Sequence, residues 1–245
     1  MLSMGVFRNL IPLNLSVFLA PTAIRALTKP PPTHKITLVI ATGNPGKFNE
    51  MATLLAGVDA LLVPLDRAGP IPPMPPEGGE SFQENAWRKA EAVACASGHL
   101  ALADDSGLEV DALGGLPGVL SARFGGPQAT DAERNARLLE LLRGIPPERR
   151  TARFRCVVAI ADARGSVQVA EGVCEGRIAL EPRGSRGFGY DPVFEIPSLG
   201  KTFAELDPEA KNRLSHRAQA MAKGRAILEG ILATRGHPDP QEGRD

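Results

Sequence analysis

The chain is poor in aromatic residues and has no excess of charge of either sign. Aromatic side chains make up 4% of its 245 residues, with one Trp and one Tyr, too few for a platform on which single-stranded nucleic acid stacks. Lys and Arg number 28, as do Asp and Glu, so the formal net charge is zero. Proteins that follow a nucleic acid backbone are usually basic. We therefore expect any phosphate chemistry to act on a small ligand and not on a polymer.

Cysteine and histidine are also scarce. Cys95, Cys156 and Cys174 form no CxxC pair, which argues against a zinc ribbon or a disulfide framework and favours buried free thiols. The four histidines form no HExxH or HxE arrangement, which argues against a zinc hydrolase.

Long apolar runs are missing, and so are acidic residues near the start of the chain. No run reaches the roughly 18 residues that a membrane-spanning helix needs, and the first acid is Glu50. We expect residues 1–34 to be a processed or dispensable extension: a signal peptide, an organellar presequence or a read-through from an upstream start codon. Residues 236–245 are expected to be a flexible tail, leaving 35–235 as the folded domain. A cytoplasmic location is expected, with a targeting presequence left open.

Strand and helix signals alternate early and give way to a hairpin, which predicts a mixed α/β fold. Strands are expected at 35–41, 60–65, 100–103, 108–111, 177–180 and 193–196, and the hairpin at 153–161 with 166–174. Helices are expected at 47–56, at 82–97 and 131–143 behind the capping residues Ser81 and Thr130, and over 208–234.

Two polar segments each follow an expected strand. Residues 42–47, Thr-Gly-Asn-Pro-Gly-Lys, would present backbone N–H groups to a phosphate, although a plain turn with a solvent-facing lysine is the alternative. In residues 104–107, Asp-Asp-Ser-Gly, strand alternation sends the two carboxylates to opposite faces. We expect one to face a site, where it could hold Mg²⁺, and the other to be structural. An ordinary turn that closes the strand is the alternative.

Two further segments lie near the C-terminus. Residues 186–192 carry the single tyrosine beside Phe188 between glycines, which suits stacking on a base or a tight turn with a core aromatic. His216 and Arg217 lie about 140° and 240° from Lys211 around a continuous helix, so a shared site requires a break near Leu214–Ser215, which we predict. A solvated basic helix surface is the alternative.

In this order, the segments resemble the inosine triphosphate pyrophosphatase family, the Ham1-type nucleoside triphosphate pyrophosphatases. The matching stretches are ATGNPGK at 41–47, SFQENAWRKA at 81–90, ADDSGLEVDALGGLPGVLSARFGG at 103–126, GFGYDPVF at 187–194 and GKTFAELDPEAKNRLSHR at 200–217. The resemblance implies an elongated mixed β-sheet flanked by helices, with two lobes and a central substrate cleft. It also implies a homodimer that needs Mg²⁺ and hydrolyses inosine, deoxyinosine and xanthosine triphosphates to the monophosphate and pyrophosphate.

The same resemblance assigns site residues. Asp105 would be the catalytic acid and a metal ligand, with Glu77 as a second metal ligand. Substrate contacts would come from Thr42, Gly43, Asn44, Pro45, Gly46, Lys47, Lys89, Ser106, Phe188, Gly189, Tyr190, Asp191, Lys211, His216 and Arg217. A related pyrophosphatase for modified pyrimidines or methylated nucleotides (Maf-type) and a non-catalytic nucleotide-binding regulator are the alternatives.

Overall fold

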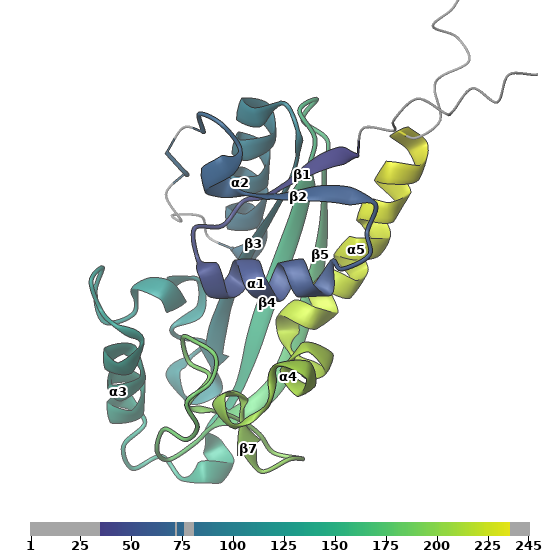
Figure 1. The fold of residues 1–245 in the computed structure, drawn as a ribbon. Helices are drawn as coiled ribbons and strands as arrows, with labels where there is room; N and C mark the ends of the chain where they lie inside the picture. The colour runs from purple at the N-terminus through teal and green to yellow at the C-terminus, as the bar shows by residue number, and fades with distance from the viewer. Residues whose placement is uncertain (1–34, 72, 76–80, 236–245) are drawn as a thin grey trace, which may run out of the picture. The chain divides into compact units, whose positions relative to one another are not determined.

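The computed structural model describes residues 35–71, 73–75 and 81–235 (Figure 1). The predictions made for residues 1–34, for Glu77 and for residues 236–245 lie outside the described residues. The described part forms a mixed sheet of seven strands with helices on both faces, which confirms the α/β fold class.

The sheet has a parallel part and a longer antiparallel part. Its strand order is β2-β1-β3-β4-β5-β6-β7, in which β1 runs parallel to β2 and β3 and the other neighbours are antiparallel. Parallel neighbours need a crossover connection, and helices α1 and α2 supply it. The strands are β1 Ile36–Ile40, β2 Ala60–Pro64, β3 Leu100–Val110, β4 Thr151–Ala161, β5 Val167–Ile178, β6 Phe194–Ile196 and β7 Lys201–Thr202.

The helices begin at capping residues. Helix α1 begins two residues earlier than predicted, because the Asn44 side chain accepts a hydrogen bond from the Lys47 N–H and Pro45 takes the first helical position. Ser81 and Thr130 cap their helices as predicted. The helices are α1 Pro45–Leu54, α2 Phe82–Ser97, α3 Asp131–Leu141, α4 Pro208–Leu214 and α5 His216–Arg235.

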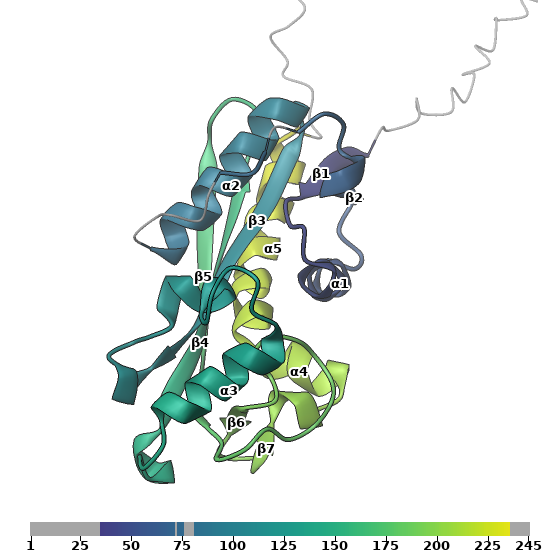
Figure 2. The same ribbon diagram turned by 90° about the vertical axis from the view of Figure 1, so that its left-hand side faces the viewer.

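The helices divide between the two faces of the sheet. Figure 2 shows α2 on one side of the long strands and α1 and α5 on the other. On the α2 face the core is built largely from small residues such as Ala90 and Ala103, and on the opposite face Met51 and Met221 pack against Val158. A third apolar cluster lies at the far end of the long strands, where α3 packs. Strands β3, β4 and β5 therefore run through two lobes. The upper lobe contains the first two clusters, one on each face of the sheet, and the lower lobe contains the third cluster and α3.

Strand β3 differs from the prediction of two short strands separated by a turn. It is one strand of 11 residues, and residues 101–110 pair continuously with β4. The Asp-Asp-Ser-Gly segment therefore lies inside the sheet. The expected strand at 177–180 is likewise the end of β5, which continues to Ile178. In both cases pairing with β4 overrides the local turn signal.

The predicted helix break is confirmed. Helix α4 ends at Leu214, Ser215 has extended backbone angles (φ −68°, ψ 155°), and α5 begins at His216. The Ser215 hydroxyl accepts a hydrogen bond from the Ala218 N–H at 3.1 Å, which starts the second helix. Among the described residues, no helix combines the length and the apolar character that crossing a membrane requires.

Candidate active site

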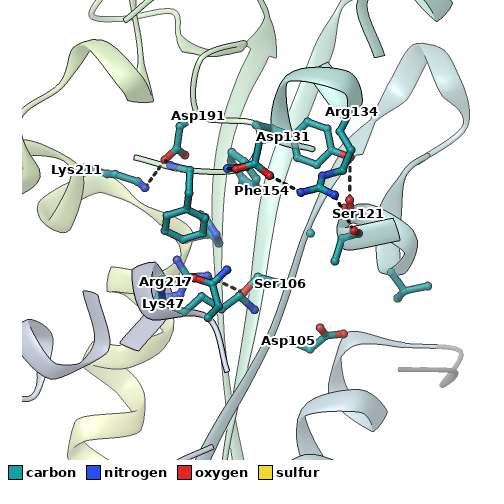
Figure 3. A pocket seen from close by; sticks show the side chains of 18 residues that line it. Lys47, Asp105, Ser106, Ser121, Asp131, Arg134, Phe154, Asp191, Lys211 and Arg217 are labelled. Atoms are coloured by element: carbon teal, nitrogen blue, oxygen red, sulfur yellow. Dashed lines mark hydrogen bonds and ion pairs between the residues drawn. The ribbon is translucent and has the colours of Figure 1, made fainter. Parts of the chain in front are cut away.

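A cleft opens between the two lobes, halfway along β3 and β4. Figure 3 shows the side chains that line it, which come from both lobes. Most of the residues predicted for the site meet here: Asn44, Lys47, Asp105, Ser106, Phe188, Gly189, Tyr190, Asp191, Lys211, His216 and Arg217.

Lys47 points toward the sheet and not into solvent. Its Nζ lies 3.1 Å from Oδ1 and 3.0 Å from Oδ2 of Asp104. The backbone before it is fixed by side chains, since the Thr42 hydroxyl accepts from the Asn44 N–H at 3.2 Å and Asn44 caps the helix. The first turn of α1 therefore presents a cation to the cleft.

The two adjacent aspartates of β3 face opposite sides of the sheet, as alternation predicts. Asp104 points toward α1 and α5, where Arg217 Nη2 lies 3.2 Å from its Oδ2 and the Ser106 hydroxyl donates to the same oxygen at 2.7 Å. Burial opposes its ionisation, but Lys47, Arg217 and Lys89 outweigh this effect and hold the pKa of the Asp104 carboxyl well below its ordinary value. Asp104 is therefore a charged anchor for cations.

Asp105 points toward α2. Its Oδ2 accepts a hydrogen bond from the Asn85 amide at 2.9 Å, and Lys89 Nζ lies 3.5 Å from its Oδ1. Lys89 also donates to the backbone oxygen of Asp104 at 2.6 Å. Asp105 differs from Asp104 in lining the cleft, so its carboxylate is the one that can meet a ligand.

A second charged group lies at the junction of α1, α4 and α5. Lys211 Nζ lies 2.7 Å from Glu50 Oε1 and 2.6 Å from Asp191 Oδ2. Arg217, which is buried, pairs with Glu50 as well as with Asp104. Burial lowers and these carboxylates raise the pKa of Arg217, with a net upward shift. The break at Ser215 is what lets Lys211 and Arg217 converge on Glu50.

His216 is a neutral, buried member of the same site. Burial, then Arg217 and Lys211, hold the pKa of His216 well below its ordinary value. Its ring stacks on Phe154 with centroids 4.6 Å apart. In the described part of the chain, His216 Nδ1 and Arg217 Nε are buried with no hydrogen-bond partner. Both residues line the cleft, so a ligand that displaces the atoms covering these two nitrogens could bond to them.

The glycine-rich loop at 187–191 forms an aromatic wall of the cleft. Phe188 lies beside the cations, 4.8 Å from Lys211 Nζ to the ring centroid. A Cβ on Gly46 would approach this ring to 2.7 Å, and a Cβ on Gly187 would approach Asp191 Oδ2 to 2.0 Å. A side chain at Gly46 would therefore displace the Phe188 ring, and one at Gly187, where φ is 77°, would displace the Asp191 carboxylate.

Tyr190 is both a core aromatic and a residue of the cleft, the two alternatives that the sequence left open. The side chain is buried in the core of the lower lobe, and its hydroxyl donates to the Ser121 backbone oxygen at 2.9 Å. The same residue lines the cleft. The packing makes it a fixed part of the wall.

The remaining predicted residues lie around the cleft. Thr42, Gly43 and Pro45 line a neighbouring depression that shares Asn44 with it. Gly46 lies against Phe188. Lys89 lies beside Asp105, on the α2 side of the sheet. Glu77 lies outside the described residues.

Several residues of the site were not predicted from the sequence, and four of them have polar side chains. Glu50 binds two of its cations, and Ser121, Asp131 and Arg134 line the cleft. Glu50 follows Lys47 by three positions on α1, which places both on one helix face; that spacing is the signal that could have found it. Asp131 and Arg134 follow a capping residue and carry no comparable signal.

The donor set of the cleft suits Mg²⁺ only in part. Mg²⁺ prefers oxygen ligands and is usually bound through one or two carboxylates together with substrate phosphates and waters. Asp105 offers one such carboxylate at the cleft. Within residues 35–71, 73–75 and 81–235, no group of three or more His, Cys, Asp or Glu side chains could hold a metal ion alone. A metal here would depend on oxygens of a bound phosphate.

An α/β fold with lysines, arginines and an aromatic wall around one cleft defines a site for a small anionic ligand with a planar group. Comparison with known proteins identifies the family. The Ham1 family model matches residues 38–227, and the chain belongs to the Ham1 family.

Individual relatives agree with this assignment. The chain is 52% identical over 196 residues to a dITP/XTP pyrophosphatase of Desulforamulus reducens, covering 79% of this chain and 96% of that protein. Its fold is similar to a HAM1 protein from Coxiella burnetii, with a TM-score of 0.73, 43% identity and coverage of 80% and 99%. It is also similar to a nucleoside-triphosphatase / dITP/XTP pyrophosphatase from Mycobacterium abscessus, with a TM-score of 0.64, 42% identity and coverage of 77% and 98%.

Proposed function

We propose that this chain hydrolyses deaminated purine nucleoside triphosphates, dITP, ITP and XTP, to the monophosphate and pyrophosphate. The observation that carries the proposal is its 52% identity, across 96% of the relative's length, to a protein named dITP/XTP pyrophosphatase. The cleft supports it, because cations and an aromatic wall lie together where a nucleotide would need them. Such hydrolysis would remove deaminated purines from the nucleotide pool.

The reaction requires water to attack the α-phosphorus in line with the departing pyrophosphate. Positioning and charge neutralisation dominate catalysis of this kind. In our proposal the Asp105 carboxylate orients the attacking water and accepts its proton. Lys47 and Lys89 would offset the negative charge that develops on the leaving pyrophosphate. Both lie within 3.5 Å of an aspartate of β3.

We propose Mg²⁺ as the cofactor, with Asp105 as a ligand and Glu77 as a second one. Bound there, it would neutralise phosphate oxygens and lower the pKa of a coordinated water. Charge balance supports the proposal. Lys47, Lys89, Lys211 and Arg217 are each within 3.5 Å of at least one carboxylate oxygen. A triphosphate therefore adds negative charge to a cleft whose cations already have anionic partners.

Selection of the base would follow from hydrogen-bond chemistry. Hypoxanthine and xanthine carry an acceptor at position 6, where adenine carries a donor amine. The buried Arg217 Nε–H is a donor without a partner among the described residues, and an acceptor from the base would satisfy it. Leaving such a buried group unpaired costs about 1–3 kcal/mol, and sites built on hydrogen bonds reject mismatched substrates steeply.

We also propose that the protein is a homodimer and is cytoplasmic. The dimer is implied by the family resemblance and has no support of its own from the cleft. Light scattering coupled to size exclusion tests it, since a dimer has twice the mass of the 25.9 kDa chain. Fractionation of cells expressing the full chain tests the location.

The decisive experiment is a panel of common, deaminated, methylated and modified triphosphates, assayed with and without Mg²⁺. Pyrophosphate and orthophosphate are scored separately. We expect Mg²⁺-dependent release of pyrophosphate from dITP, ITP and XTP at the highest kcat/KM. A preference for modified pyrimidines or methylated nucleotides would favour a Maf-type activity, and binding of dITP without product would favour a regulator. Release of orthophosphate would place the attack at another phosphorus.

A further inference from the structure

The first turns of α3 hold both backbone polar groups of Gly189, in the loop that forms the aromatic wall. The Gly189 N–H donates to Asp131 Oδ2 at 2.6 Å, and the Asn135 amide donates to the Gly189 oxygen at 3.0 Å. Asp131 and Asn135 are four positions apart on α3 and therefore share one face of the helix. We call these three residues the Gly189 clamp. Both backbone groups of one loop residue are thus bound by side chains from a different element.

The loop beside the clamp is closed on its other side by Asp191. The Phe188 N–H donates to Asp191 Oδ2 at 2.9 Å, and the Asp191 N–H donates to the Phe188 oxygen at 3.2 Å. The Phe188 ring then lies between Gly46 and the Lys211 ammonium. A shift of Gly189 would therefore be passed directly to the ring that faces the cleft.

Helix α3 does not need the clamp for its own stability. Its N-terminus has a complete capping box, in which Thr130 and Glu133 bond each other's backbone N–H. Its apolar face packs through Leu138 into the core of the lower lobe. Loss of the clamp should therefore release the loop and leave the helix in place.

Asn135 carries a cost that packing does not explain. The residue is buried, and among the described residues its Oδ1 has no hydrogen-bond partner. An unpartnered buried oxygen is unfavourable, and an apolar residue would avoid that cost. The Asn135 amide group offsets this cost by donating a hydrogen bond to the Gly189 oxygen.

The carboxylate of the clamp also fixes a cation at the wall of the cleft. Asp131 pairs with Arg134, whose guanidinium donates to the backbone oxygens of Ala122, at 3.1 Å, and Ala129. Figure 3 shows Arg134 beside Asp131 and Ser121, on the opposite side of the cleft from Lys47. One carboxylate thus joins the loop, the helix and the guanidinium.

We propose that Asp131 and Asn135 are positioning residues for the nucleoside end of the cleft. They hold Gly189, and with it Phe188, where the base binds, and so determine affinity and the choice of base. The hydrolytic step depends on Asp105, whose carboxylate faces Asn85 and Lys89 of α2, whereas the clamp is bonded to α3. This inference rests on the proposed function.

The test compares Asp131→Ala and Asn135→Ala with Asp131→Asn and Glu133→Ala in the full chain. Asp131→Asn keeps an oxygen that can accept from Gly189. Glu133→Ala removes the capping box from the same helix turn without touching the loop. The measurements are kcat and KM for dITP and dATP in Mg²⁺, with Tm recorded for every variant. The Asp131 side chain is 45% exposed, so its replacement leaves the core intact.

We expect both alanine variants to raise KM for dITP about tenfold, which is equivalent to about 1.4 kcal/mol. The kcat should change less than about threefold, because the variants lose substrate binding and not the chemical step. The preference for dITP over dATP should fall by a similar factor. Asp131→Asn should keep KM within about threefold of the wild-type value. Glu133→Ala should lower Tm and leave kcat and KM unchanged.

The inference is overturned if Asp131→Ala leaves KM and the base preference unchanged, or if Glu133→Ala shifts KM as much. If Asn135→Ala fails to fold, the KM and base preference of Asp131→Ala still test the inference. A wild-type chain that releases no pyrophosphate from dITP would refute the proposed function and this inference together. A wild-type chain that does so, with Asp131→Ala behaving identically, would refute the inference alone.

Discussion

Replacing Asp104 and Asp105 one at a time should give opposite results, although the two residues are adjacent. Asp104→Asn removes the charge that Lys47 and Arg217 approach to 3.0 and 3.2 Å. The Asp104 and Arg217 side chains are 1% and 2% exposed, so water cannot replace the lost partner. The asparagine amide would also direct a donor toward two cations.

The magnitude follows from this burial. Removing one member of a buried ion pair costs about 3–5 kcal/mol, because the other charge is left uncompensated. In a chain of this size each kcal/mol lowers Tm by about 2–4 °C, so Asp104→Asn should lower Tm by roughly 6–20 °C. Asp105→Asn keeps an oxygen for the Asn85 amide, and Lys89 keeps the Asp104 backbone oxygen. The lost charge also removes the Lys89–Asp105 ion pair, but Lys89 lies 3.5 Å from that carboxylate and keeps its second acceptor. The cost should therefore be about 1.5 kcal/mol, the low end for a hydrogen bond to a charged group.

The assay pairs thermal unfolding with pyrophosphate release from dITP. Asp104→Asn should unfold at lower temperature and, below its Tm, retain activity at a reduced level. Asp105→Asn should keep a Tm close to that of the wild type and lose pyrophosphate release. Turnover by Asp105→Asn within about tenfold of the wild type would refute its catalytic role, since general base catalysis alone contributes at least about 10²-fold. A Tm for Asp104→Asn within about 2 °C of the wild type would refute its role as the anchor of the cations.

Two more predictions concern the cations and His216. Glu50→Gln should lower the free energy of unfolding in urea by about 2–3 kcal/mol, because hydrogen bonds from Lys211 and Arg217 to a charged acceptor are weakened; an unchanged urea midpoint would contradict this. The pKa of His216 is lowered in the folded chain, so below pH 6.5 the unfolded chain binds a proton that the native one does not. Between pH 7.5 and 5.5 the wild type should therefore lose up to about 1.4 kcal/mol more stability than His216→Asn; equal losses in urea titrations at the two pH values would count against a neutral buried His216.

The elements that the sequence predicts correctly are those whose signals are local. Capping residues at Ser81 and Thr130 and the β-branched run at 36–40 act within a few positions, and the structure agrees with them. Strand β3 was predicted wrongly because Asp-Asp-Ser-Gly is locally typical of a turn. The pairing of β3 with β4 and the cations of distant helices make those carboxylates acceptable inside a sheet, and neither can be seen in a short window of sequence.

The break at Ser215 and the role of Glu50 are two consequences of the same geometry, but only one could be predicted. A straight helix cannot bring Lys211 and Arg217 to one point, so any hypothesis that uses both residues requires a break between them. The point on which they converge is a carboxylate more than 160 positions earlier in the chain, since the two ion pairs span 161 and 167 residues. The spacing from Lys47 places Glu50 on the same face of α1, but nothing near Glu50 in the sequence shows that Lys211 and Arg217 are its partners. Positions on one helix constrain each other through the periodicity of the backbone, whereas a partner brought in by the tertiary fold has no such relation in the sequence.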